Sequence, residues 1–152
     1  MSHVYNDIPG AGSTIAILLT STMTVIPGAY EISWDGFKQN TRNPTGLTDG
    51  RVRKKPGLPD FGTVKFKCYF DPNNTVHQSL RDRVKNGTPT AALDSWQIIY
   101  ADGSTSPANA NISGFLSEFN QSGFEPVTGT LIFDGTVEVD NVTSFVAGNP
   151  AT

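Results

Sequence analysis

The sequence predicts a mainly β fold, an antiparallel β-sandwich or barrel with one flanking α-helix. Fifteen Gly and ten Pro in 152 residues favour short strands joined by turns over long helices. Apolar and polar residues alternate along several segments, with the period of a half-buried strand. Fifteen aromatic residues are spread among β-branched ones, a composition unlike that of a disordered chain. The length suits a single domain.

The first part of the chain is expected to hold an arm and three strands. Residues 1–13 are polar and contain glycine, which predicts an N-terminal arm before a β-domain over residues 14–139. Residues 14–20 are typical of a buried strand, and residues 24–29 of a short strand that ends in a Pro-Gly turn. A third strand is expected where three apolar residues alternate with polar ones: Tyr30, Ile32 and Trp34.

The alternation stops between residues 39 and 62, which are dense in turn residues. We expect an irregular loop there, too long to be a mere connector and therefore functional or mobile. The loop contains the cationic run at residues 51–55. A contact loop or solvated charge fits this run better than a nucleic-acid site, because no aromatic residues interleave with it.

The clearest strand and the only convincing helix follow this loop. Alternate residues place one apolar face on the strand: Val64, Phe66, Cys68 and Phe70. A helix is expected over residues 73–86, because Asp71-Pro72 is a start signal and Asn86-Gly87 a stop signal. Three apolar residues recur every four positions along it and are expected to pack on the sandwich: Val76, Leu80 and Val84.

The remaining strands are predicted from two hairpin signals. Residues 96–100 alternate into a turn at Asp102-Gly103, and residues 109–119 form the return strand, with Gly114 a candidate bulge. The longest alternation runs from Thr128 to Val139, and residues 140–152 are expected to form a polar tail. One face of this last strand is polar: Thr130, Ile132, Asp134, Thr136 and Glu138.

Charge is distributed unevenly along the chain. The net charge is −3, but all eleven cations lie between Lys38 and Lys85, and residues 86–152 contain acidic residues and no Lys or Arg. Two readings stay open. The asymmetry is either a solvated accident, or the sign of a protomer whose basic part meets the acidic part of a neighbour.

Nothing in the sequence argues for catalysis, a metal or a cofactor. His3 and His77 have no Cys or His partner at metal-ligand spacing, and His77 is expected on the helix surface or at an interface. Phosphate-loop, nucleophile-elbow and dinucleotide motifs are missing. The single Cys68 is expected to be a small buried hydrophobe. No signal peptide or membrane-length apolar stretch is visible, so synthesis in a cytoplasm is expected.

The order of several motifs resembles one family, the tail tube proteins of long-tailed, non-contractile bacteriophages. The resemblance covers about residues 10–139. It is carried by residues 25–28 (VIPG), residues 56–64 (PGLPDFGTV), residues 69–73 (YFDPN), the helix pattern at residues 77–80 (HQSL), a Trp/Ile strand with the turn at 102–103, and the final strand. Each motif is weak alone, and their order and spacing make the match moderately specific.

The resemblance implies a structural, non-enzymatic virion protein, made in the cytoplasm of a host bacterium and located in the tail tube. Such subunits form six-membered rings in which strands of all subunits join one barrel around a lumen, and the rings stack. The implied partners are further copies of the chain, a tape-measure protein, a tail terminator and distal tail proteins. Double-stranded DNA passes through without specific binding, and no membrane or cofactor is involved.

The resemblance also assigns roles to two sets of residues. The loop over residues 39–62 is expected to contact the next ring through Arg51, Arg53, Lys54, Lys55, Leu58 and Asp60. The final strand is the candidate lumen wall, with Thr130, Asp134, Thr136 and Glu138 facing the lumen. An acidic lumen suits a DNA conduit, because it repels phosphates.

Two alternatives remain at this point. Tubes of contractile tails and secretion machines, and other ring proteins such as tail terminators, share the implied fold, so fold alone leaves the role open. A β-sandwich that binds carbohydrate, as a decoration module, would be a different class of protein. It should expose clustered aromatic residues beside polar ones, whereas Trp34 and Trp96 are expected in the core.

Overall fold

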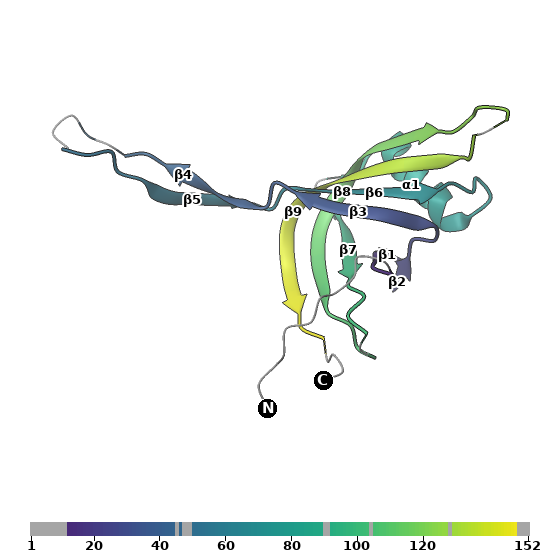
Figure 1. Cartoon of the computed structure of the whole chain (residues 1–152), viewed down its shortest axis with the longest axis horizontal. Helices are drawn as coiled ribbons and strands as arrows, with labels where there is room; N and C mark the ends of the chain where they lie inside the picture. The colour runs from purple at the N-terminus through teal and green to yellow at the C-terminus, as the bar shows by residue number, and fades with distance from the viewer. Residues whose placement is uncertain are drawn as a thin grey trace.

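The structure, a computed structural model, describes residues 12–44, 46, 50–89, 92–103, 105–127 and 129–148. Strands and one helix alternate with short turns along this part of the chain (Figure 1). The strands are β1 (Thr14–Leu19), β2 (Thr22–Val25), β3 (Ala29–Asp35), β4 (Lys38–Arg42), β5 (Lys55–Asp60), β6 (Thr63–Tyr69), β7 (Asp94–Ile99), β8 (Asn109–Ser122) and β9 (Ile132–Val146). The helix is α1 (Thr75–Asn86). The predicted mainly β fold with one flanking helix is confirmed.

One antiparallel sheet makes up the body, in the order β2-β1-β7-β8-β9-β6-β3. The long strands β8 and β9 bend, so the sheet folds into two layers (Figure 1). The first half of β8 pairs with β7, up to the pair Asp94–Gly114, while the first half of β9 pairs with β6, up to the pair Glu138–Thr63. β8 and β9 therefore belong to both layers of the sandwich.

Glycine at position 114 allows the bend in β8. The ladder between β8 and β9 shifts register between Ser113 and Gly114, which confirms the predicted bulge. A Cβ at Gly114 would lie 2.2 Å from the carbonyl oxygen of Glu138. Only glycine fits this close backbone approach, and the bulge turns the strand from one layer into the other.

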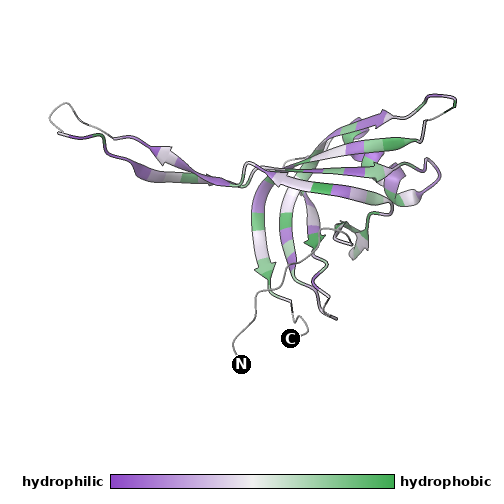
Figure 2. Cartoon of the chain, in the orientation of Figure 1, coloured by the Kyte–Doolittle hydropathy of each residue, from purple (hydrophilic) through white to green (hydrophobic). Residues whose placement is uncertain are grey.

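The core lies between the two layers and consists of alternate residues of the strands. Green bands cross the strands of the body in Figure 2, as the alternation predicts. Trp96, Phe66 and Phe133 are its largest buried side chains. Phe66 covers the backbone of Gly135, its cross-strand partner, where a Cβ would lie 2.4 Å from the ring. Three residues of the predicted apolar face, Val64, Phe66 and Cys68, are at most 1% exposed. The fourth, Phe70, follows the end of β6 and packs half-buried against the core.

The helix starts slightly later than its sequence signal suggests. Asn74 is the N-cap, and its side-chain oxygen accepts hydrogen bonds from the backbone N–H groups of Val76 and His77. The Asp71 carboxylate accepts instead from the backbone N–H of Asn73, which forms the turn before the helix. Gly87, with a φ of 80°, ends the helix where predicted.

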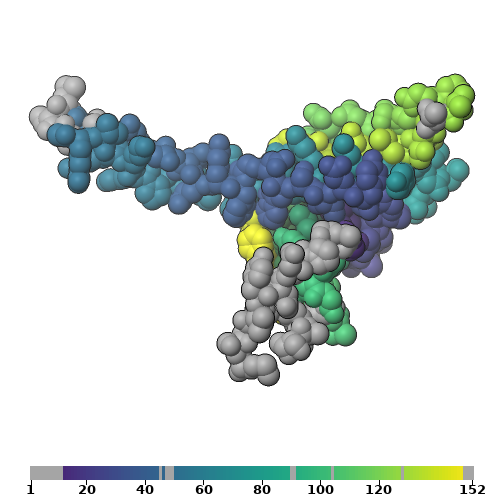
Figure 3. All heavy atoms as spheres, in the orientation of Figure 1, coloured from purple at the N-terminus to yellow at the C-terminus, as the bar shows by residue number. Residues whose placement is uncertain are grey.

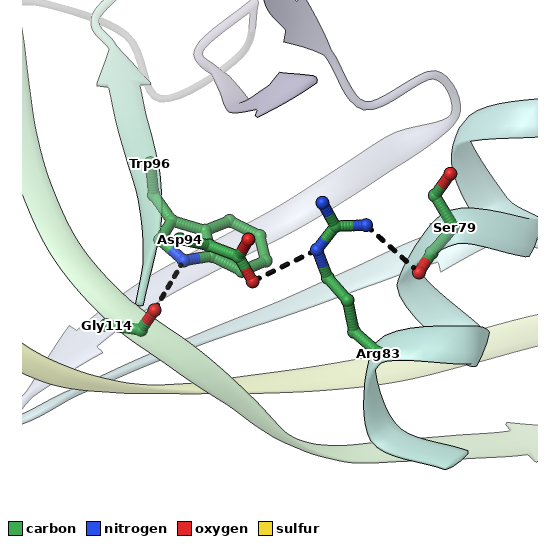
Figure 4. A network of polar contacts seen from close by, with 5 residues as sticks. All are labelled: Ser79, Arg83, Asp94, Trp96 and Gly114. Carbon is green, nitrogen blue, oxygen red and sulfur yellow. Dashed lines mark hydrogen bonds and ion pairs between the residues drawn. The ribbon is translucent and has the colours of Figure 1, made fainter. Parts of the chain in front are cut away.

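The helix lies against the sandwich through its apolar stripe and one ion pair. Val76 and Leu80 are buried in the core, and Val84 packs half-buried against it. The Arg83 guanidinium donates to the Asp94 carboxylate at 3.0 Å and to the Ser79 carbonyl oxygen (Figure 4). Beside it, Trp96 Nε1 donates to the Gly114 carbonyl oxygen. The Arg83–Asp94 contact holds the helix near the bend of β8, because Asp94 is the cross-strand partner of Gly114.

The expectation that His77 lies on the helix surface is wrong. The side chain is 2% exposed, and its ring contacts Phe133 edge-on. Nδ1 accepts a hydrogen bond from the backbone N–H of Asp71, so Nε2 carries the proton and donates to the carbonyl oxygen of Pro27. The histidine is thus a satisfied core residue that joins the helix to two turns.

Two predicted boundaries are also wrong. The supposedly irregular segment 39–62 contains strands near both ends, because β4 and β5 pair as a separate two-stranded sheet. The supposed polar tail at 140–152 continues β9 as far as Val146, which pairs with Asn109. Residues 149–152, and residues 1–11 of the expected N-terminal arm, lie outside the described residues.

Candidate assembly surfaces

The layer made by β3, β6, β9 and the second half of β8 has one polar face. Its side chains lie in rows across the strands, since Glu31 pairs with Lys67, Lys67 with Asp134, and Asp134 with Asn120. The next row contains Ser33, Lys65, Thr136 and Glu118. The opposite face of the same strands is the core, so this face is the outer surface of the layer.

Charge on this polar face is mixed, with acidic residues in excess. Its carboxylates are those of Glu31, Asp35, Glu118, Asp134 and Glu138, and its cations are Lys65 and Lys67. Lys67 forms an exposed ion pair with Glu31 at 3.7 Å. Glu138 accepts hydrogen bonds from the hydroxyl groups of Thr63 and Ser117, which orient its carboxylate. Two lysines of β6 therefore stand among five carboxylates that β3, β8 and β9 contribute.

The residues expected to face the lumen are not all on a strand. Asp134, Thr136 and Glu138 lie on the polar face and are half-buried. Thr130 is exposed and precedes β9, which begins only at Ile132. The turn before β9 contains a bond from the Gly129 N–H to the Glu125 carbonyl oxygen, so the chain is not yet extended there. Sequence alternation alone could not mark this start.

Both outer strands of the polar layer have a free edge. Among the described strands, β3 is the last of the sheet and pairs only with β6. β8 loses its partner β7 after Gly114, so residues 115–122 pair only with β9 among the described strands. Free edges expose unpaired N–H and C=O groups, which natural proteins cover or pair. The layer is therefore open on two opposite sides.

The β4–β5 hairpin projects far from the body as an arm (Figures 1 and 3). All of β4 and five of the six residues of β5 are exposed along its length. Arg51, Arg53, Lys54 and Lys55 are exposed at the distal end. Leu58, 81% exposed, and Asp60 lie on β5, closer to the body. All six residues predicted for a contact loop thus lie on this arm.

Two glycines join the arm to the body. Gly36 and Gly62 have positive φ values of 85° and 75°, and a Cβ at Gly62 would lie 2.1 Å from the carbonyl oxygen of Asp35. The Trp34 indole N–H donates to the carbonyl oxygen of Phe61 at 2.6 Å across this junction. The junction is tightly packed, and it fixes the direction in which the arm leaves.

An aromatic cluster surrounds the base of the arm. Trp34 contacts Phe37 and Phe145 at ring-centroid distances of 5.3 and 6.1 Å, and Phe37 contacts Phe61. Phe37 and Phe145 are more than half exposed, and Trp34 is half-buried, so the expectation of a core Trp34 holds only in part. Trp96 is fully buried, as expected. Sequence reasoning missed this cluster, because the bend of β9 brings Phe145 to Trp34.

The single cysteine, Cys68, lies in the core and not on these surfaces. Burial, and to a lesser extent the charge of Asp134, raise the pKa of the Cys68 thiol to about 12. In the part of the chain that the structure describes, no group of three His, Cys, Asp or Glu residues could hold a metal ion. Within the same residues, no helix has the length and hydropathy to span a membrane.

Comparison with known proteins reveals likeness in structure and none in sequence. The sequence matches no protein-family model and no curated protein. A chain of the PVC sheath–tube complex, from an extracellular contractile injection system in the extended state, has a TM-score of 0.70 and 17% identity and covers 91% of each chain. A chain of the anti-feeding prophage tube-terminating cap has a TM-score of 0.71 and 15% identity, and covers 94% of this chain and 93% of its own.

The SPP1 tail tube is a further structural neighbour, with a TM-score of 0.66 and 13% identity over 96% of this chain and 82% of the other. The neighbours thus include a tail tube, a chain of an extracellular contractile injection system and a tube-terminating cap. At such low identity the likeness is one of fold. This chain has the fold that is found in tail tube and tube terminator structures.

Proposed function

We propose that the chain is a structural subunit of a phage-type tail tube, which assembles into stacked six-membered rings. The observation that carries the proposal is the polar layer, which is open at both edges. A layer with one buried face, one polar face and two free edges can continue into identical neighbours on both sides. When the rotation between neighbours permits, such head-to-tail contacts close a ring and remove the free edges.

The polar face of the layer is the proposed lumen wall. Its excess of carboxylates repels the phosphates of double-stranded DNA, which can then slide through the tube during ejection without binding. Lys65 and Lys67 moderate this repulsion. Carboxylates lie near both lysines in the cross-strand rows. Asp134, Thr136 and Glu138 are repeated by the ring symmetry into bands around the lumen in this proposal.

The basic arm is the proposed contact between successive rings. It stands clear of the body, is basic at its distal end and leaves the body in a fixed direction (Figure 3). Acidic groups of a neighbouring subunit suit such a tip, and the contact should weaken as salt screens it over a Debye length of about 8 Å at physiological ionic strength. The proposed partners beyond the chain itself are a tape-measure protein, a tail terminator and distal tail proteins.

The order of the sequence motifs supports a long-tailed phage with a non-contractile tail, and the virion as the location of the protein. A contractile tail or an injection machine is the alternative within the same class. The two differ in whether a sheath surrounds the tube. Electron microscopy of the particle that contains the protein distinguishes them directly.

Assembly of the purified protein tests the proposal. Light scattering across protein and salt concentrations, with negative-stain microscopy of the same samples, should show six-fold rings or tubes at high concentration. A strictly monomeric mass under all conditions, even with virion partners present, would contradict the proposal.

The lumen assignment has its own test. Replacing Asp134 and Glu138 together by lysine should leave the subunit folded and the tube intact, but the tube should retain DNA and eject it poorly. Asp82→Lys is a control that changes the charge on the exposed side of α1 instead, and it should leave DNA passage unchanged. A tube structure with both carboxylates on the outer wall would overturn the assignment.

A carbohydrate-binding module is the second candidate, and the exposed aromatic cluster favours it. Phe37 lies beside Lys38, Gln39 and Asp60 in a shallow pocket, an arrangement that could stack and hydrogen-bond a sugar. Binding of a glycan panel to the monomer, lost on Phe37→Ala, would support this function. No binding, together with ring assembly, would exclude it.

A further inference from the structure

The turn between β8 and β9, residues 123–131, holds two large apolar side chains in water. Val127 is 94% exposed and Phe124 is 66% exposed. A single exposed apolar residue is common on a protein surface, whereas two of them within four residues of one turn indicate a contact surface. No contact within the described part of the subunit buries either side chain.

The backbone of this turn is held in one conformation. The Gly129 N–H donates to the carbonyl oxygen of Glu125 at 3.1 Å, which closes the turn. Gly123 has a positive φ of 88°, and a Cβ at this position would clash with the carbonyl oxygen of Thr130. Pro126 restricts its own φ. Little conformational entropy is therefore lost when the turn binds a partner.

The aromatic cluster at the base of the arm offers a matching surface. Four rings line a shallow pocket of about 270 Å³: Trp34, Phe37, Tyr100 and Phe145. Phe37 lies edge-on to both Trp34 and Phe145, at interplanar angles of 71° and 87°. A further aromatic side chain can join such a cluster with the edge-to-face geometry that aromatic pairs prefer.

The turn and the aromatic cluster lie toward opposite ends of the body. In Figure 1 the arm leaves the body on the left, and the β8–β9 turn lies at the right-hand end. Ile132, next to the turn, is six residues along β9 from Glu138, which shares a cross-strand row with Thr63 and Asp35. Six strand residues span about 20 Å. The turn therefore needs a second copy to reach such a cluster, and a head-to-tail contact of this kind extends into a stack.

Charge favours the same arrangement. Residues 38–60 of the arm contain six cations and two carboxylates, whereas residues 115–139 contain four carboxylates and no cation. At the contact itself, Glu125 lies in the turn and Lys38 begins β4 at the base of the arm, and both are exposed. Docking the turn at the base of a neighbour's arm brings opposite charges together, whereas contacts between two arms or between two turns repel.

We propose that the β8–β9 turn of one subunit docks into the aromatic cluster at the base of the arm of a subunit in the next ring, with Phe124 and Val127 as its apolar anchors. The inference rests on the proposed stacking of rings and names the surface that receives each subunit. The basic arm, which points away from its own body, then lies along the acidic β8–β9 hairpin of the docked neighbour.

Removing the anchors should separate stacking from folding and ring closure. Phe124→Ser combined with Val127→Ser should unfold at the temperature of the parent, because both side chains are exposed in the subunit. Rings should still form, but the loss of two buried apolar groups from the contact should lower the yield of tubes at least about tenfold. Phe124→Tyr combined with Val127→Ile keeps the apolar bulk and should restore tubes. Sedimentation and negative-stain microscopy measure the yield, and normal tubes from the double serine variant would overturn the docking.

Disulfide cross-linking locates the contact on the arm. Glu125→Cys is combined with Lys38→Cys or, as the matched control, with Arg42→Cys, which is also exposed on β4. The assembled protein is oxidised and run on a non-reducing denaturing gel. The native Cys68 does not interfere, because it is fully buried. The link should be at least about tenfold stronger with Lys38→Cys, because four residues of β4 displace the control cysteine by about 13 Å, beyond the reach of a disulfide.

Tubes without a link to position 38, or with an equally strong link to position 42, would overturn the docking and leave the proposed tube function standing. Wild-type rings that never stack would also overturn the docking. A wild-type protein that stays monomeric would overturn both.

Discussion

His77 and Pro27 are 50 residues apart in the chain and are joined by a hydrogen bond of 2.7 Å, from the imidazole Nε2 to the carbonyl oxygen. The second ring nitrogen accepts from the backbone of Asp71, so one side chain connects the turn before β3, the turn after β6 and the helix. Both bonds are satisfied only by the neutral ring with its proton on Nε2. The neutral histidine is therefore part of what holds α1 on the sandwich.

Replacing this histidine by leucine should destabilise the subunit by about 1–3 kcal/mol. The substitution keeps the apolar bulk but removes the partner of the Asp71 N–H and of the Pro27 carbonyl oxygen, whose bonds to the buried ring are part-buried. Urea unfolding followed by circular dichroism measures the change. Gln78→Ala is the control, because its bond to Pro72 is exposed, and it should cost much less. Equal losses for both variants would contradict the role assigned to His77.

Leu80→Ala should cost about 2–5 kcal/mol, since it removes a fully buried side chain from the core. Val84→Ala should cost less, because Val84 is only half-buried. The free energy of unfolding of the monomeric subunit is the measurement. A loss near zero for Leu80→Ala would mean that the helix stripe does not contribute to the subunit core.

Gly135→Ala should destabilise the subunit by about 1–3 kcal/mol through overpacking. The new Cβ would lie 2.4 Å from the Phe66 ring, which is itself fixed among buried neighbours. Gly50→Ala is a matched control, because nothing lies within 4 Å of its added Cβ. Thermal unfolding of both variants compares them. A stable Gly135→Ala variant would show that the core gives way at Phe66.

Shortening the arm should separate folding from assembly. Arg42 and Lys55 are cross-strand partners, so an Asn-Gly turn can replace residues 43–54 and close a shorter hairpin. The variant should unfold like the parent but fail to form tubes, because the basic tip is lost. Deletion of residues 48–55 should act in the same way. Normal tubes from either variant would refute the role of the arm.

The Cys68 thiol should be unreactive in the folded protein. A thiolate-specific reagent at pH 8 should label it slowly in buffer and rapidly in denaturant, because burial holds the pKa at about 12. The same shift has a pH consequence. Above about pH 9 the unfolded chain releases the thiol proton while the folded chain keeps it, so stability should fall as the pH rises toward 12. Fast labelling of the folded protein would contradict the burial.

Several elements could be predicted because they depend on short stretches of chain. The alternation in β6 needs only neighbouring residues, and so do the stop signal at Gly87 and the bulge at Gly114. The register of a buried strand is fixed once one of its faces is apolar. For this reason the core residues of β6 and the polar residues 134, 136 and 138 of β9 lie where the sequence pattern predicts them. These features determined the fold class and placed Asp134, Thr136 and Glu138, the residues of the proposed lumen wall, on one face.

The rest depended on partners that are distant in sequence. β4 and β5 have few apolar residues, so no periodicity marked them, and only their mutual pairing makes an arm of segment 39–62. The polar residues 140–146 are a strand because β8 supplies the ladder. Histidine is polar and is expected at the surface, yet His77 is buried. Its ring can be buried because it hydrogen-bonds two backbone groups from separate turns. The sequence by itself determined a β-domain with one polar strand face. Tertiary structure alone decided where that face ends, which edges stay free and where the aromatic cluster forms, because each of these depends on how the bent strands β8 and β9 bring remote residues together.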